Sequence, residues 1–96
     1  MMDFEWDPKK ADENLRKHGI TFEEASLAFF DEWAIEEFDD SHSDVDEKRF
    51  VIIGVAGIHL LRVVYTVRDK IRIISAERAR SFDGRAYSRN RNEHDQ

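Results

Sequence analysis

The stretch RFVIIGVAGIHLLRVVYTVRDKIRIISA, residues 49–76, decides the fold. It contains three runs rich in Val and Ile that are separated by very short connections: 49–56, 59–67 and 70–76. β-Branched residues favour strands, and connections of this length join antiparallel neighbours. The sequence therefore predicts an antiparallel meander of three strands.

Two helices are expected before this meander. Asp7 suits the N-cap of the first helix, Pro8 its first position and Gly19 the residue after its last turn. Residues 21–24, TFEE, match a capping box, so a second helix should begin there and end near Asp31. Because the link between the two helices is so short, we expect a helical hairpin packed on the sheet.

The remaining segments complete an α+β fold. Residues 34–38 are a short candidate strand and 39–47 a polar loop. A short C-terminal helix is expected from Ala79 through Tyr87, and the tail 89–96 is expected to fray. The predicted architecture is an N-terminal helical hairpin on a small antiparallel sheet, followed by this short helix.

Length and composition are those of a single globular domain. With 96 residues, of which 41% are hydrophobic, we expect one domain over 1–96 with an ordered core at about 3–88. The chain has no cysteine, and its first residues, MMDFEWD, contain no apolar leader. We therefore expect a soluble, cytoplasmic protein with no membrane contact.

Charge is distributed unevenly along the chain. Residues 1–47 hold 4 Lys and Arg against 16 Asp and Glu, a net charge of −12, whereas residues 48–96 hold 11 against 5, a net charge of +6. A basic surface could meet phosphate, and an acidic surface could meet a basic protein. Alternatively, the two halves interleave in space and their fields cancel.

The opening helix gathers several cations. At helical spacing Lys10, Asn14 and Lys17 share one face, and His18 stands at the last turn. This face could be one wall of an anion site. Alternatively, charge pairs at i,i+4 spacing simply decorate a solvated helix, and His18 interacts with the helix dipole.

A second cationic group surrounds the last strand. Arg72 lies inside the apolar run IRIISA, Arg62 lies on the preceding strand, and Glu77, Arg78 and Arg80 follow directly. Guanidinium groups bind phosphate through bidentate hydrogen bonds, and Glu77 is a candidate general base. Alternatively, these residues form an Arg–Glu network on an exposed sheet face. The sequence leaves open whether Arg62 and Arg72 share a face.

The loop DDSHSDVDE at 39–47 alternates acidic residues with His42. This pattern fails as a calcium-binding loop, because a loop that opens at Asp40 has no glycine at its sixth position and Val51 in place of the closing glutamate. We expect a solvated loop there, with no metal and no cofactor in the protein.

Several separated motifs resemble one known family. These are F-E-W-D-P-x-K at 4–10, N-L-x-K-H-G at 14–19, F-E-E-A at 22–25, and V-Y-T and R-I-I-S-A between 63 and 76. Their order and spacing resemble the BrnT family, small toxins of bacterial toxin–antitoxin modules that are related in fold to RelE-type ribonucleases. The resemblance extends from Phe4 to Tyr87.

The resemblance implies a RelE-like α+β fold and a metal-independent endoribonuclease that cleaves RNA and inhibits translation. It also implies a cognate BrnA-like antitoxin with a ribbon-helix-helix part. That antitoxin would neutralise the toxin in a heterotetramer. Operator DNA would be contacted only through the antitoxin.

Carried over by position, the family's helix motif corresponds to Lys10, Asn14, Lys17 and His18, and its strand-end motif to Arg72, Ser75 and Arg78. We expect catalysis by Arg72, Arg78, Glu77 and His18. We expect RNA binding by Lys10, Lys17, Arg62 and Arg80.

Two departures from the family pattern lower the local positive charge. Glu77 stands where many relatives have arginine, and Asp83-Gly84 replaces part of a basic, glutamate-containing helix. The alternative is therefore a weak or inactive relative that acts as a protein-binding or co-repressor module.

Overall fold

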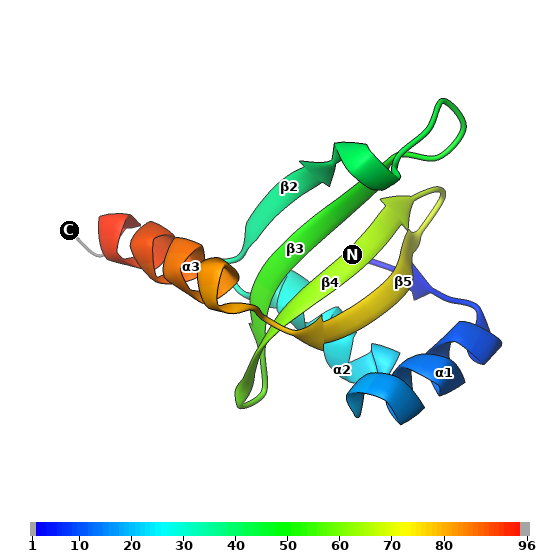
Figure 1. Cartoon of the computed structure of the whole chain (residues 1–96), viewed down its shortest axis with the longest axis horizontal. Helices are drawn as coiled ribbons and strands as arrows, with labels where there is room; N and C mark the ends of the chain where they lie inside the picture. The colour runs from blue at the N-terminus through cyan, green and yellow to red at the C-terminus, as the bar shows by residue number, and fades with distance from the viewer. Residues whose placement is uncertain (1, 95–96) are drawn as a thin grey trace.

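The structure is a computed structural model that describes residues 2–94. Its helices and strands follow in the order β1 (Phe4–Glu5), α1 (Pro8–His18), α2 (Phe22–Ser26), the 3₁₀-helix η1 (Leu27–Phe30), β2 (Ile35–Asp39), the 3₁₀-helix η2 (Asp40–His42), β3 (Arg49–Ala56), β4 (His59–Val67), β5 (Ile71–Arg78) and α3 (Ser81–His94). Figure 1 shows one twisted sheet with α2 and α3 on opposite sides of it.

The sheet has five strands in the order β1-β5-β4-β3-β2. Strands β3, β4 and β5 pair antiparallel in sequence, so the predicted meander is confirmed. Strand β2 adds to it antiparallel, at the position expected for residues 34–38. Strand β1 pairs in parallel with β5, which makes the sheet mixed.

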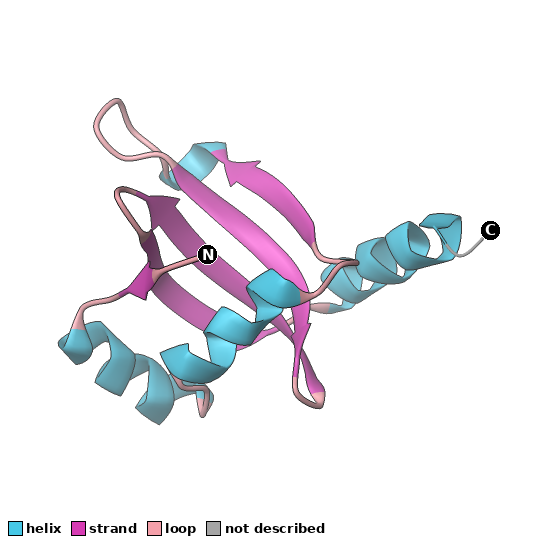
Figure 2. Ribbon diagram, turned by 180° about the vertical axis from the view of Figure 1, so that it is seen from behind, coloured by secondary structure: helices cyan, strands magenta, loops and turns pink. Residues whose placement is uncertain are grey.

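The predicted architecture of a helical hairpin on a small antiparallel sheet is therefore wrong. The parallel strand β1 is only two residues long, and so short a segment carries no alternation of polar and apolar residues that could reveal it. Helix α2 is also only five residues long and continues as η1, so α1 and α2 do not form a hairpin of comparable helices. The C-terminal helix α3 begins at one end of the sheet on its other side and extends beyond it (Figure 2).

Local signals at both ends of α1 and at the start of α2 are confirmed. The Asp7 carboxylate accepts a hydrogen bond from the Lys9 N–H at 2.9 Å, and Gly19 follows α1 in the left-handed region with φ of 71°. The Thr21 hydroxyl accepts a hydrogen bond from the Glu24 N–H at 3.0 Å and caps α2. Short-range capping chemistry therefore determines where these two helices begin.

Helix α2 and η1 cover one face of the sheet at close range. Phe22, Ala25 and Ala28 are completely buried in a core shared with Ile52. At Gly54 of β3, a Cβ atom would lie only 2.6 Å from the Ala28 carbonyl oxygen. Glycine is therefore required at this position for η1 to approach the sheet.

Helix α3 packs on the other face through Tyr87, which contacts Val51 and Ile53. The Tyr87 hydroxyl donates a 2.7 Å hydrogen bond to the Asp31 carboxylate, which also accepts the Val55 N–H at 2.7 Å. Burial and this hydrogen bond raise the pKa of Tyr87 to about 12. Burial of Asp31 by itself would raise its pKa, whereas the hydrogen bonds that its carboxylate accepts lower it. The hydrogen bonds prevail, so the pKa of Asp31 lies below the ordinary value.

The helix also continues beyond its predicted end. The sequence predicted a helix through Tyr87 and a frayed tail over 89–96, but the structure is helical as far as His94. The Asn90 side-chain amide donates a 3.0 Å hydrogen bond to the Trp33 carbonyl and ties this last part of the helix to the body of the protein. Residues 95–96 of that predicted tail lie outside the described residues.

Asn14 joins α1 to β5. Its side-chain amide donates to the Ile20 carbonyl at 3.0 Å and to the Ala76 carbonyl at 2.9 Å, and its side-chain oxygen accepts the Ala76 N–H at 3.0 Å. Asn14 is itself buried. Two of these hydrogen bonds satisfy the backbone groups of Ala76 at the edge of β5, and the third satisfies the Ile20 carbonyl that follows α1.

Replacing Asn14 by alanine should therefore destabilise the protein. Leaving buried backbone groups unpaired costs roughly 1–3 kcal/mol each, so we expect the free energy of unfolding to fall by at least about 2 kcal/mol. Urea denaturation measures this change, with Asn92→Ala, an exposed position on α3, as the control that should change little. Equal effects of both substitutions would contradict this role of Asn14.

Candidate nucleic-acid interface

An extra residue in β5 decides which side chains of this strand share a face. Tyr65 of β4 is opposite Ile73, whereas the preceding Val64 is opposite Ser75, so the ladder skips Ile74. Such a β-bulge reverses the alternation of side chains in the part of the strand that follows it.

The bulge determines on which face of the sheet each predicted charged residue of β5 lies. Arg72 is opposite Thr66, and Glu77 is opposite Arg62. Because Arg62 and Thr66 lie on the same face of β4, Arg72 and Glu77 share that face with them. Arg78 points to the other face. The open question of the sequence is thus answered: Arg62 and Arg72 share a face, whereas Arg72 and Arg78 do not.

The face that carries Arg62 is hollowed beside the start of α3. This hollow, which we call the sheet hollow, has a cavity volume of about 440 Å³. Three predicted residues line it, namely Arg62, Glu77 and Arg80. Its other lining residues are Asp39, Ser41, His42, Arg49, Val64, Ile74 and Ser75.

Two smaller hollows adjoin the sheet hollow along α1. The first, of about 170 Å³, is lined by residues of α1 and β5: Lys10, Glu13, Asn14, Lys17, His18, Ile74 and Ser75. The second, of about 180 Å³, is lined by Asp7, Lys10, Glu47, Arg49, Thr66, Arg68, Arg72 and Ile74. Because Ile74 lines all three hollows, the cations of the opening helix border the arginine-bearing face of the sheet.

Arg78 is the predicted site residue that the structure places elsewhere. It is opposite Leu61, a core residue beneath α1 and α2, and lies at the end of β5. Its Nη2 is 3.2 Å from Nε2 of His59, and its side chain lines none of the three hollows. A role for Arg78 in RNA cleavage stays a prediction, without support from the geometry.

Arg62 is held firmly in the sheet hollow. Its Nη1 donates a 2.8 Å hydrogen bond to Asp83, and the two side chains are only 19% and 5% exposed. The second carboxylate oxygen of Asp83 accepts the Arg80 N–H at 3.0 Å. Asp83 thus neutralises Arg62 and at the same time orders the entry into α3.

The other arginines make more exposed ion pairs. Arg80 lies 2.9 Å from Glu77, and Arg49 lies 3.1 Å from Glu47. Exposed pairs of this kind contribute little free energy, roughly 0–1 kcal/mol each. These two guanidinium groups can therefore exchange a carboxylate for another anion at little cost, whereas Arg62 cannot.

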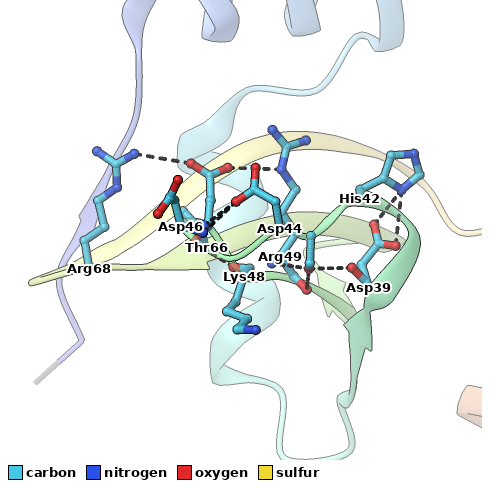
Figure 3. Close-up of polar contacts among 10 residues, drawn as sticks. Asp39, His42, Asp44, Asp46, Lys48, Arg49, Thr66 and Arg68 are labelled. Atoms are coloured by element: carbon cyan, nitrogen blue, oxygen red, sulfur yellow. Dashed lines mark hydrogen bonds and ion pairs between the residues drawn. The ribbon is translucent and has the colours of Figure 1, made fainter.

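His42 and Asp39 form an acid–base pair at the rim of the sheet hollow (Figure 3). His42 Nδ1 lies 2.9 Å from Asp39 Oδ2, and Ser41 donates a hydrogen bond to Oδ1 of the same carboxylate at 3.0 Å. Burial opposes ionisation of Asp39, but the hydrogen bonds from His42 and Ser41 prevail and lower its pKa. With Nδ1 bound to a carboxylate, Nε2 of His42 is left to act on a ligand.

The loop that carries His42 is ordered by its own polar groups. The Asp44 carboxylate accepts the N–H groups of Asp46 and Glu47 at 2.8 and 2.7 Å, and the Ser43 hydroxyl accepts the Arg49 N–H at 2.8 Å. Figure 3 shows how these contacts close the loop above β3. Among the alternating acidic residues, Asp44 thus serves the local fold.

Two further observations concern metals and membranes. Across residues 2–94, no group of three or more His, Asp or Glu side chains is placed to hold a metal ion. Over the same residues, none of the helices combines the length and the apolar character that a membrane span requires.

The sequence matches the model of one protein family, described as a ribonuclease toxin, BrnT, of type II toxin–antitoxin systems, over residues 6–83. The chain belongs to the BrnT family. This confirms the resemblance drawn from its motifs and identifies a ribonuclease toxin with an antitoxin as its partner. The match includes every residue that lines the three hollows. No curated protein sequence matches the chain.

The sequence analysis of this BrnT toxin missed His42, Asp39 and Arg49 as site residues. A signal for Arg49 was present, because a two-residue turn after Ala56 sets the register of β3 against β4. That register puts Arg49 opposite Thr66, on the face that carries Arg62. No comparable signal existed for His42, because its position depends on the fold of the 39–48 loop.

The Arg62–Asp83 pair of this BrnT toxin should matter for stability. Asp83→Ala would leave a largely buried guanidinium without its partner, at a cost on the order of 3 kcal/mol. Glu77→Ala breaks the exposed pair with Arg80 in the same hollow and should cost less than about 1 kcal/mol. Urea denaturation of both variants tests this difference, and similar losses for the two would contradict it.

Proposed function

We propose that the sheet hollow binds a phosphodiester of RNA and that the protein cleaves it as a metal-independent endoribonuclease in the cytoplasm, thereby inhibiting translation. The observation that supports this is the convergence of Arg49, Arg62 and Arg80 with the Asp39–His42 pair in one hollow. In the proposed reaction the 2′-hydroxyl oxygen attacks the adjacent phosphorus atom. The bond to the 5′-oxygen breaks, and this oxygen takes a proton from solvent water, which leaves a 2′,3′-cyclic phosphate and a 5′-hydroxyl.

His42 is proposed to accept the proton of the 2′-hydroxyl. Its Nδ1 is engaged by Asp39, so Nε2 carries the lone pair that a base needs, and Asp39 stabilises the imidazolium that forms. Glu77 is also in the hollow, but its carboxylate is already engaged in an ion pair with Arg80. His18 lines one of the two smaller hollows, beside α1, and is not among the residues that line the sheet hollow. It therefore lies next to the proposed reaction site.

The arginines are proposed to stabilise the charge that develops on the phosphoryl oxygens. Arg62 is held in place by Asp83 before RNA binds, so it needs little rearrangement. Arg49 and Arg80 leave their exposed carboxylate partners and turn to the phosphate. Guanidinium groups can supply this stabilisation without a metal ion.

Lys10, Lys17 and Arg72 are proposed to bind the phosphates on either side of the cleaved bond. They line the two smaller hollows that meet the sheet hollow at Ile74. Contacts with phosphates release counterions, so RNA binding should weaken as the salt concentration rises.

Substitution of His42 by alanine tests the proposed chemistry. We expect the cleavage rate to fall by about 10²–10⁴-fold, the usual contribution of general acid–base catalysis, with little change in RNA affinity. The assay is digestion of a labelled single-stranded RNA, in EDTA as well as in buffer. Arg78→Ala is the matched control, because Arg78 lies outside the hollows, and its rate should stay close to that of wild type.

Several outcomes would overturn parts of this account. Undiminished cleavage by His42→Ala would remove His42 from the reaction. Loss of cleavage in Arg78→Ala alone would move the site to the other face of the sheet. Wild-type protein that binds its antitoxin but cuts no RNA would favour the inactive binding module.

We further propose that the antitoxin binds the opposite face of the sheet. Aromatic rings form a continuous series there, with neighbouring centroids 4.9–6.2 Å apart, which we call the aromatic surface: Phe38, Phe50, Tyr65, Phe29, Phe4 and Phe30. Its two ends are exposed, Phe38 at 48% and Phe30 at 62%. Edge strand β2 adds Glu36, which is opposite Ile52, to one side of it.

This surface suits a partner segment that is both apolar and basic. The aromatic surface belongs mostly to the half of the chain with a net charge of −12, so a basic segment would be attracted to it. As the family resemblance implies, we propose a BrnA-like antitoxin with a ribbon-helix-helix part. It would form a heterotetramer with the toxin and contact operator DNA.

The double substitution Phe30→Glu and Phe38→Glu should weaken this complex. Truncating exposed aromatic anchors of an interface costs about 2 kcal/mol or more, so we expect the affinity to fall by at least about tenfold. The toxin is purified with the protein of the neighbouring reading frame, and binding and RNA cleavage are both measured. Leu15→Glu, 47% exposed on α1, is the control. An unchanged affinity of the double variant would contradict this interface.

A further inference from the structure

An aromatic side chain stands beside the sheet hollow with no role in the core. Phe82, in the first turn of α3, is 52% exposed. Its ring lies against Arg62, with the guanidinium carbon 5.9 Å from the ring centroid. Exposure of about half of a phenylalanine side chain loses much of the free energy that its burial would supply. About half of the Phe82 side chain is therefore accessible to a ligand.

The backbone next to Phe82 is anchored beside the sheet hollow. The next residue, Asp83, is buried, binds Arg62 and accepts the Arg80 N–H. Arg62 and Arg80 both line the sheet hollow, so Phe82 lies next to two of its lining residues. One face of the Phe82 ring is covered by the guanidinium of Arg62, in a cation–π contact. A flat apolar group thus stands beside the guanidinium that we assign to the phosphate.

We propose that Phe82 is a binding position for a nucleobase, on which a base adjacent to the bound phosphodiester stacks. The proposal rests on the function assigned above to the sheet hollow. A phosphate at Arg62 and a base on Phe82 would belong to one nucleotide or to direct neighbours. Aromatic side chains bind bases of any sequence in this way, because every base has a π-face.

This position also selects the kind of RNA. A base can stack on Phe82 only when it has left its neighbours in a helix, since the bases of duplex RNA are already stacked and paired. The substrate class is therefore single-stranded RNA, with stronger binding of purines, whose larger rings overlap more of the phenyl group. The match to the BrnT family ends at residue 83, so Phe82 stands at the very end of the matched part.

Binding to an uncleavable RNA tests the proposal. A cut site is first mapped with the wild-type protein, and the RNA around it is then made with 2′-deoxyribose at that position. Fluorescence anisotropy compares wild type with Phe82→Ala, Phe82→Leu and Phe82→Tyr. Alanine and leucine lack a π-face and should weaken binding by about 5- to 100-fold, whereas tyrosine should stay within about twofold of wild type.

Matched controls separate stacking from loss of fold. Leu27→Ala shortens a similarly exposed apolar side chain on η1, away from the hollows, and should leave RNA binding unchanged. Phe82→Leu keeps the apolar volume, so a merely structural role would be rescued by leucine as well as by tyrosine. An RNA with abasic sites beside the cut position should bind wild type and Phe82→Leu equally, because the stacking partner is then absent from both.

The outcomes distinguish this proposal from the one on which it rests. If wild type cleaves RNA and Phe82→Leu binds as tightly as wild type, the stacking position is wrong and the nuclease site stands. Equal affinity for duplex and single-stranded RNA would also overturn it. If wild type neither cuts nor binds RNA, the assignment of the sheet hollow itself fails.

Discussion

The residue that β5 inserts at Ile74 determines which charges can act together. Without it, Arg72 and Arg78 would share a face and Glu77 would point away from Arg62. With it, the side chains after Ile74 point to the opposite faces from those they would otherwise take. Arg62 and Glu77 therefore meet on the face that α1 and α2 leave open. The side chain of Ile74 also lines each of the three hollows. One unpaired residue thus organises the whole interface.

The bulge needs support, because it interrupts the ladder next to a sheet edge. Asn14 gives that support two residues later, where it pairs with both backbone groups of Ala76. The same side chain fixes α1 against β5, and therefore fixes where Lys10 and Lys17 stand relative to the sheet. The cationic wall of the opening helix and the arginines of the sheet are joined through one buried amide.

What the sequence could predict depended on local chemistry. Neighbouring residues alone predict the caps at Asp7 and Gly19 and the three strands of residues 49–76. The structure contains both caps and all three strands. The bulge at Ile74 and the parallel strand at 4–5 rest on partners far along the chain, which no short pattern reveals. Glycine at 84 has a low helix propensity, yet α3 continues through it, because the tertiary contacts of Tyr87 outweigh that propensity.

The charges of the interface explain how an acidic protein can be suited to RNA. Carboxylates accompany every arginine of the sheet hollow, so the average charge is low and long-range attraction for RNA is modest. These carboxylates differ, however, in how firmly they hold their partners. Asp83 is buried and keeps Arg62 in position, whereas Glu47 and Glu77 are more exposed and can release Arg49 and Arg80. A phosphate would therefore meet one fixed guanidinium and two that become free as it arrives, an arrangement that depends on geometry more than on net charge.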